Sequence, residues 1–138
     1  MRFMMLVKAS EDSEAGALPS EGQLVEMGRY NDELVKAGVL LAADGLQASV
    51  KGARVVFSGG QTTVTDGPFT ETKELIAGYW VIQVRSKDEA LEWARRVPFQ
   101  DGEIEIRQVF EAEDFGDALT PELREQEERQ RAEMTAKR

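Results

Sequence analysis

Residues 65–74 constrain the fold of this chain most strongly, because they combine turn-forming and ionisable residues between two strand-like runs. Pro68 holds its own φ near about −65° and restricts the conformation of Gly67 before it. The pair predicts a rigid corner, with Phe69 as an apolar anchor and the Asp66 carboxylate capping backbone N–H groups. A second interpretation is compatible with the first, since loops held by stiff corners often carry functional sites and this corner also suits the rim of a cleft.

Composition excludes several classes of site. The 138 residues suit one domain, and the net charge of −9 argues against binding to nucleic acid or to anionic membranes. The sequence has no histidine and no cysteine, which excludes Ser-His-Asp and Cys-His catalysis as well as zinc-thiolate sites. Acid–base chemistry would depend on Asp, Glu, Lys, Tyr or Arg, and a metal would need oxygen ligands. We predict no metal and no cofactor.

Targeting signals are also missing from the pattern. Residues 1–8 are too short and too soon interrupted by charge for a signal peptide. No apolar run approaches the length that spans a bilayer. We therefore predict a cytoplasmic protein that does not bind membranes.

Hydrophobic periodicity predicts alternating strands and helices along residues 1–111. Ser20 and Ser86 are candidate N-caps, with Glu89 completing a capping box, and Gly59-Gly60 suits a hairpin turn. We expect loops at 10–18 and 42–52. The predicted strands are 2–9, 39–41, 54–58, 62–66, 76–85 and 103–111, and the predicted helices run over about 20–37 and from 86 to 97.

The predicted helices each have an apolar stripe at helical spacing. In the second helix it contains Ala90, Trp93, Ala94 and Val97. One polar residue, Asn31, lies on the stripe of the first helix, either as an amide satisfied by a backbone carbonyl or as a polar group presented to a cavity. The first stripe consists of Leu24, Met27, Asn31, Leu34 and Val35.

The order of elements is β-α-β, a hairpin, then β-α-β. This order predicts the α+β class, with a ferredoxin-like split βαβ fold and an inserted β-hairpin. Two helices cover one face of such a sheet, and the other face is too apolar to remain in water. We therefore expect a two-fold homodimer with its sheets face to face. The apolar residues of that face are Met4, Leu6, Tyr79 and Val81, and Arg2, Lys8, Gln83 and Arg85 would line a cleft.

The composition changes after about residue 113. We predict a single domain over 1–117 and a charged C-terminal tail over 118–138. Thr120-Pro121 is typical of a helix start, so the tail is predicted to be helical, although a frayed tail also fits its few apolar residues. A helical tail of this kind suits contact with a protein partner.

Four short motifs support a resemblance to a known family. They are Asp66-Gly-Pro-Phe69 with the Thr-Glu-Thr-Lys-Glu74 that follows it, Phe57-Ser-Gly-Gly60, Gly78-Tyr-Trp80 and Ile104-Glu-Ile-Arg107. Over residues 1–117 the chain resembles the DGPF group of YCII-related proteins. The resemblance implies a dimeric α+β barrel built from ferredoxin-like subunits.

The resemblance also bears on function. YCII-related proteins outside this group carry a His–Asp pair, and some take part in breaking down chlorinated or hydroxylated aromatics. The histidine cannot be transferred, because the helix position that would hold it is Met27 or a neighbour. Some DGPF proteins occur beside or fused to alternative sigma factors, which implies a regulatory or ligand-sensing role.

Two functions follow as hypotheses. The first is a small-molecule-binding or regulatory protein with its ligand in a cleft on the dimer-facing side of the sheet. The alternative is a lyase- or isomerase-like enzyme that uses Asp66 as general base, provided that a neighbouring carboxylate or burial raises the Asp66 pKa. The predicted catalytic residues are Asp66, Lys73 and Tyr79, and the predicted ligand-binding residues are Asn31, Tyr30, Arg54, Glu71 and Glu74.

Overall fold

The structure, a computed structural model, describes residues 1–137. Its contacts divide the chain into a larger unit, Met1–Gln108, and a smaller one that begins at Val109. No helix among the described residues is long and apolar enough to cross a membrane.

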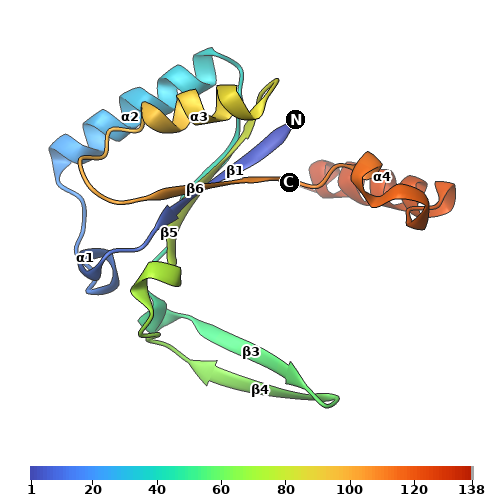
Figure 1. Ribbon diagram of the computed structural model, residues 1–138, viewed down its shortest axis with the longest axis horizontal. Coiled ribbons are helices and arrows are strands. Elements are labelled where there is room, and N and C mark those ends of the chain that lie inside the picture. The colour runs from blue at the N-terminus through green and yellow to red at the C-terminus, as the bar shows by residue number, and fades with distance from the viewer. Residues whose placement is uncertain (138) are drawn as a thin grey trace. The chain divides into compact units, whose positions relative to one another are not determined.

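The larger unit is built on a four-stranded antiparallel sheet with the order β2-β5-β1-β6 (Figure 1). Both long helices of this unit, α2 and α3, lie on one face of the sheet (Figure 1). This arrangement is the split βαβ of a ferredoxin-like fold, so the predicted α+β class is confirmed. The elements are β1 (Arg2–Lys8), α2 (Glu21–Lys36), β2 (Leu40–Gly45), β5 (Ile76–Gln83), α3 (Lys87–Arg95) and β6 (Ile104–Gln108).

The inserted hairpin consists of β3 (Ala53–Ser58) and β4 (Gln61–Asp66), which form a separate two-stranded sheet. Its register runs from Ala53 opposite Asp66 to Ser58 opposite Gln61. The two-residue connection has Gly59 at φ 58° and Gly60 at φ 78°. Two successive positive φ values are typical of the tight turns that match strand twist, and glycine adopts them without steric cost.

Two expected loops contain regular structure. Residues 10–18 include the short helix α1 (Glu11–Glu14), because Ser10 and Ser13 cap each other's backbone N–H groups at 3.1 and 2.9 Å. Strand β2 continues to Gly45 instead of ending at residue 41. Pairing of Asp44 with Tyr79 on β5 overrides the turn signal that Asp44-Gly45 gives in the sequence.

The core lies between the sheet and the two helices. Phe3, Met5 and Ile82 of the sheet are buried against Leu34 of α2 and Ala90 of α3. Two residues of the stripe predicted for α2 are not buried, since Leu24 is exposed and Val35 is 60% exposed, whereas Leu34 is buried and Met27 packs against the core as predicted. Tyr30 is buried in their place, because the helix turns the face of Met27, Tyr30 and Leu34 toward the sheet. The remaining core residues are Val39, Trp80, Val84 and Val97.

The helix starts are capped largely as predicted. Ser20 accepts a hydrogen bond from the Gln23 N–H, and Gln23 Oε1 accepts one from the Ser20 N–H. Ser86 likewise accepts from the Glu89 N–H at 3.2 Å. The predicted capping box at α3 is incomplete, because the Glu89 carboxylate accepts from the Arg85 N–H at 2.8 Å and not from Ser86.

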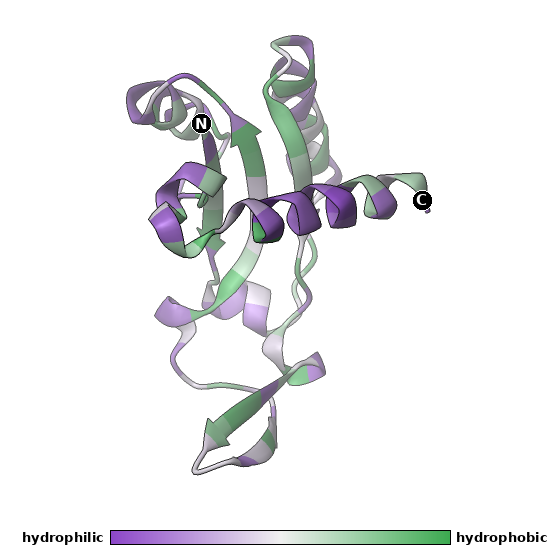
Figure 2. Ribbon diagram, turned by 90° about the vertical axis from the view of Figure 1, so that its right-hand side faces the viewer, coloured by the Kyte–Doolittle hydropathy of each residue, from purple (hydrophilic) through white to green (hydrophobic). Residues whose placement is uncertain are grey.

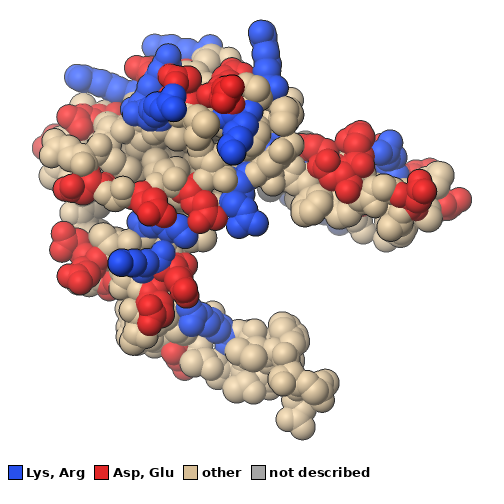
Figure 3. All heavy atoms as spheres, in the orientation of Figure 1, with Lys and Arg blue, Asp and Glu red and all other residues tan. Residues whose placement is uncertain are grey.

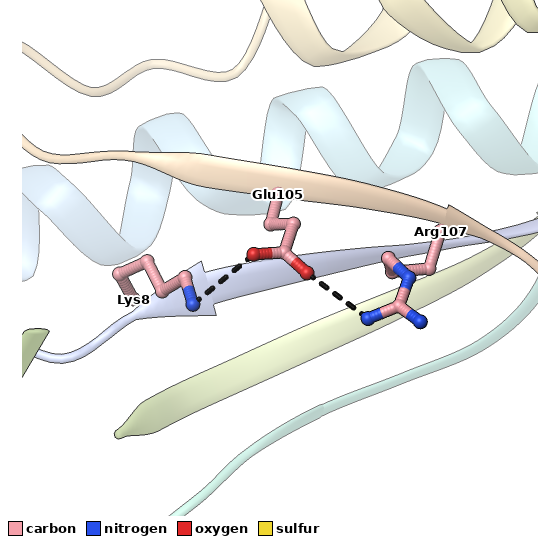
Figure 4. Close-up of polar contacts among 3 residues, drawn as sticks. All are labelled: Lys8, Glu105 and Arg107. Atoms are coloured by element: carbon pink, nitrogen blue, oxygen red, sulfur yellow. Dashed lines mark hydrogen bonds and ion pairs between the residues drawn. The ribbon is translucent and has the colours of Figure 1, made fainter. Parts of the chain in front are cut away.

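The open face of the sheet mixes apolar and charged side chains. Leu6 of β1 lies opposite Tyr79 on one side and Glu105 on the other. The Glu105 carboxylate accepts from Lys8 Nζ at 3.2 Å and from Arg107 Nη1 at 3.3 Å (Figure 4). Hydrogen bonds from Lys8 and Arg107 stabilise the charged carboxylate and lower the Glu105 pKa. A dimer across this face stays a prediction.

The smaller unit contains two helical segments, η3 (Ala112–Ala118) and α4 (Pro121–Ala136). Thr120 caps α4 by accepting from the Leu123 N–H at 3.2 Å, and the Phe110 and Phe115 rings stack at 5.0 Å. Hydrophilic residues dominate α4 (Figure 2). The boundary between a domain at 1–117 and a tail at 118–138 stays a prediction.

Candidate functional site

A cavity of about 800 Å³ opens at one end of the four-stranded sheet, between the chain after α1, helix α2 and the loop that follows β2. Four of the residues that line it, Val7, Met27, Ala43 and Trp80, also belong to the core or pack against it. The cavity is therefore on the helix-covered side of the sheet, whereas the sequence analysis expected a ligand cleft on the open face. Its apolar lining includes Val7, Met27, Leu46, Trp80 and Phe99, and its polar lining includes Glu14, Asn31, Asp44, Lys51 and Tyr79.

Asn31 has a defined orientation in this cavity. The Trp80 indole Nε1–H donates to Asn31 Oδ1 at 2.9 Å. An indole nitrogen is only a donor, so the Asn31 oxygen must face Trp80. Among residues 1–137, no hydrogen bond uses the amide nitrogen Nδ2 of Asn31. Asn31 lines the cavity, and the two N–H groups of its amide are held in orientation by this bond while they have no partner among these residues.

The corner at Gly67-Pro68 is attached to the wall of the cavity. The bond between these residues is cis. Ser49, at the start of the short helix η1 (Ser49–Lys51), accepts from the Phe69 N–H at 3.0 Å. Ser49 in turn donates through its N–H and its hydroxyl to the two carboxylate oxygens of Glu14. The Glu14 carboxylate thus joins α1 to the corner across 55 residues of sequence.

Comparison with known proteins places this chain in a family. The model of the YCII-related domain matches residues 1–113. The chain belongs to the YCII-related family. The family predicted from the sequence motifs is confirmed, while membership of the DGPF group stays a prediction.

Two further proteins are similar to this YCII-related chain. A curated protein of Rhizobium meliloti (strain 1021), described as uncharacterized, is 44% identical over 61 residues, which is 44% of this chain and 49% of that protein. The match therefore spans about half the length of this relative. A solved structure of 5-chloro-2-hydroxyhydroquinone dehydrochlorinase from Burkholderia phenoliruptrix AC1100, in complex with 2,5-dihydroxybenzoquinone, has a TM-score of 0.42 and 12% identity. That comparison covers 83% of this chain and 98% of the other.

Most of the predicted site residues lie away from the cavity of this YCII-related protein. Asn31 and Tyr79 line it, whereas the other six predicted residues do not. Tyr30 is in the core, where its hydroxyl donates to the Trp93 carbonyl at 2.7 Å. Three more, Glu71, Lys73 and Glu74, are exposed on or beside the short helix η2 (Thr72–Glu74).

The two predicted site residues of the hairpin base, Asp66 and Arg54, also have other roles. Asp66 is exposed at the end of β4, and no hydrogen bond to its side chain occurs within residues 1–137. The capping role predicted for Asp66 is wrong, because the Ser49 hydroxyl binds the corner N–H instead. The Arg54 guanidinium stacks 3.7 Å from the centre of the Phe69 ring, which lies outside the core cluster. Ser49 and Glu14 were missed because their partners are 20 to 35 residues away.

Within the part of the chain that the structure describes, no three carboxylate side chains gather closely enough to hold a metal ion.

A polar pair lies beside the cavity, on the open face of the sheet, because Tyr79 and Asp44 alternate with Trp80 and Ala43 along their strands. The Tyr79 hydroxyl donates to Asp44 Oδ2 at 2.9 Å. This hydrogen bond and the negative charge of Asp44 stabilise the protonated phenol, so they raise the Tyr79 pKa. Burial raises the pKa of Tyr30, the other tyrosine of the chain.

We expect Asp44→Asn to lower the Tyr79 pKa toward its ordinary value, since the variant removes both the charge and the strongest acceptor of the phenol proton. Tyrosinate absorbance in the ultraviolet measures the titration. Tyr79→Phe identifies the signal, because only Tyr30 then remains and Tyr30 ionises at higher pH. An unchanged titration in Asp44→Asn would show that the hydrogen bond is not formed in solution.

Proposed function

We propose that this YCII-related protein binds a small molecule in the cavity between α1, α2 and the loop after β2, as part of a ligand-sensing or regulatory function. The observation that carries the proposal is the cavity itself. Its volume of about 800 Å³ lies in the range of about 300–1,000 Å³ that is typical of small-molecule sites. Its lining combines an apolar wall with a few polar groups, as ligand sites do.

The lining indicates what chemistry the ligand has. Trp80, Phe99 and Met27 offer contacts to an apolar or ring-shaped body. The Asn31 amide offers N–H donors beside the Trp80 ring, which suits a carbonyl, carboxylate or hydroxyl oxygen. Lys51 adds a positive charge to the lining, and no ion pair involving it occurs within residues 1–137. An apolar ligand with one oxygen acceptor group fits this set.

The geometry favours ligand binding over catalysis with Asp66 as the general base. Asp66 does not line the cavity, so a molecule held there would not meet its carboxylate. The two carboxylates that do line it have partners, since Glu14 accepts from Ser49 and Asp44 accepts from Tyr79. An enzyme with Asp66 as base would need its substrate at the hairpin base instead.

The protein is proposed to act as a homodimer, with the open faces of two sheets in contact. The half-buried Met4, Leu6 and Val81 on that face support this assembly, because single chains seldom leave such a surface in water. A protein partner for the charged C-terminal segment is likewise a proposal, supported by the exposed Leu123 and Met134 on α4.

The binding proposal is tested with a thermal-shift screen and one pair of variants. A ligand at 100 times its Kd adds about 2.7 kcal/mol of stability, so a compound with an apolar body and an oxygen acceptor is expected to raise Tm. Asn31→Ala should then weaken binding about tenfold, since one ligand hydrogen bond contributes about 1 kcal/mol and its loss also frees the Trp80 indole.

The matched control is Asp32→Ala, the next residue on α2, which is exposed and outside the cavity. It should leave the ligand Kd unchanged. The proposal fails if no compound in a broad screen raises Tm, or if Asn31→Ala and Asp32→Ala bind the same compound equally well.

A further inference from the structure

The β3–β4 hairpin carries an apolar surface that the proposed function does not use. Cross-strand pairing places Val55 opposite Val64 and Phe57 opposite Thr62, so these four side chains share one face of the ribbon. We call them the hairpin face. The side chains of Val55, Phe57 and Val64 are 52%, 77% and 65% exposed. In Figure 2, β3 is largely green, whereas β4 is mainly white to purple.

Such an exposed face is unusual for a strand pair. Alternation of apolar and polar residues normally marks strands with one buried side and one solvated side. Here the opposite side carries mainly polar residues, among them Arg54, Gln61 and Thr63, while the apolar side has nothing over it within the described chain. A two-stranded hairpin is only marginally stable by itself. The pattern therefore indicates that the hairpin face packs against another surface.

The absence of charged residues on the hairpin limits which kind of partner can bind there. Residues 55–65 contain no Asp, Glu, Lys or Arg, and this run of eleven residues is the longest in the chain without a charge. The next longest, residues 75–84, includes the central strand β5 with its buried Trp80 and Ile82. Figure 3 shows the end of the hairpin as a surface without acidic or basic residues. A partner that binds through charged side chains would therefore find no opposite charge at the end of the hairpin.

We propose that the hairpin face is a docking surface for the same face of a second copy of this chain. Two copies each carry a net charge of −9 and repel one another wherever acidic surfaces meet. Contact between copies therefore favours a surface without charge. The four side chains of the hairpin face provide one, and the Asp66 carboxylate, which pairs with Ala53 on the same side of the ribbon, lies beyond them at the hairpin base. Within one copy the large Phe57 ring lies opposite the small Thr62. A two-fold axis through the contact would allow each ring to pack over the smaller side chains of the other copy.

This contact differs from the homodimer proposed across the open sheet face. The hairpin pairs only with itself and shares no ladder with β1 or β5. Its contact therefore adds one association step, whichever way the sheets assemble.

Two neighbouring valines provide a matched pair for the test. Val55 and Val56 are 52% and 51% exposed on the same strand, but they point to opposite faces. Val55→Asp places two carboxylates in the proposed contact, one from each copy. It should raise the Kd of association through the hairpin face at least about 100-fold. Val56→Asp adds the same charge outside the contact and should leave the Kd unchanged. Sedimentation of the full chain over a range of concentrations measures both.

Cross-linking tests whether the contact is direct. The chain has no cysteine, so a single introduced thiol reports one position. Val64→Cys on the hairpin face should give a covalent dimer with a short bismaleimide, and Thr63→Cys on the opposite face should give little.

Three outcomes would overturn the proposal. They are a wild-type chain that stays monomeric at every concentration, equal masses for Val55→Asp and Val56→Asp, and equal cross-linking at positions 63 and 64. If Val55→Asp has the same mass in solution as the wild type but a lower Tm, and Val56→Asp has an unchanged Tm, the proposal is also wrong. The hairpin face would then contact another part of the same chain.

Discussion

Gly67→Ala is expected to destabilise the chain by about 3 kcal/mol and to lower its Tm by roughly 10 °C. A Cβ atom at this position would lie 1.7 Å from the Ser49 carbonyl oxygen and 2.6 Å from its carbon. Both are backbone atoms, so no side-chain rotation relieves the clash. The corner would have to open, and it would then lose the hydrogen bonds from the Gly67 N–H to Gly52 and from the Phe69 N–H to Ser49.

Gly28→Ala is the control for this substitution. Gly28 lies inside α2, and a Cβ there would meet no atom within 4 Å. Alanine is favoured over glycine in a helix by about 1 kcal/mol, so this variant should be more stable than the wild type. Urea unfolding measures both free energies. A Gly67→Ala protein within about 1 kcal/mol of the wild type would mean that η1 does not pack on the corner as described.

The fold was predictable because its signals are local. Trp80, Ile82 and Val84 alternate with residues of the other face, and this alternation needs no knowledge of the partner strands to be recognised. Ser20 and the Gly59-Gly60 turn mark their elements within four residues of sequence. With each element and its approximate ends known, the order of strands and helices leaves few topologies to choose from.

Leu34 and Met27 were correctly predicted on the buried face of α2, but the burial of Tyr30 was not predictable, because it depends on a contact across the fold. Hydrophobicity alone favours Leu24 and Val35, and it disfavours a tyrosine with a polar hydroxyl. The Tyr30 hydroxyl is satisfied by the Trp93 carbonyl, 63 residues away, and its ring packs edge-on against Trp80 at 5.6 Å. A buried polar group is acceptable only where such a partner exists, and the sequence does not show which partner it will be.

The candidate site was likewise predictable only in part, for the residues that have a local signal in the sequence. Of the two roles considered for Asn31, the structure favours the polar group in a cavity, and its partner is the Trp80 indole rather than a backbone carbonyl. A lone amide on an apolar stripe was a sufficient signal for that residue. Asp66 was chosen because it stands in the corner motif, but the corner is held by Ser49 and Glu14. Neither has a local motif, so only the folded chain identifies them.

Leu34→Ala is expected to cost about 3 to 4 kcal/mol of stability. The Leu34 side chain is 0% exposed and lies in the core cluster between α2 and the sheet. Removing its branched end leaves a space that surrounding residues fill only in part, since protein interiors are close-packed. Chemical unfolding should therefore show a lower midpoint with little change in slope, because the variant alters stability and not the surface exposed on unfolding.

Val35→Ala is the matched control, one residue further along the same helix. Its side chain is 60% exposed, so truncation removes little buried surface and alanine has the higher helix propensity. We expect a change below about 0.5 kcal/mol. The pair decides between the helix face that hydrophobicity suggests, which includes both residues, and the observed face, which includes only Leu34. Equal losses for the two variants would mean that α2 is rotated relative to its described position, and the side of Asn31 that faces the cavity would change with it.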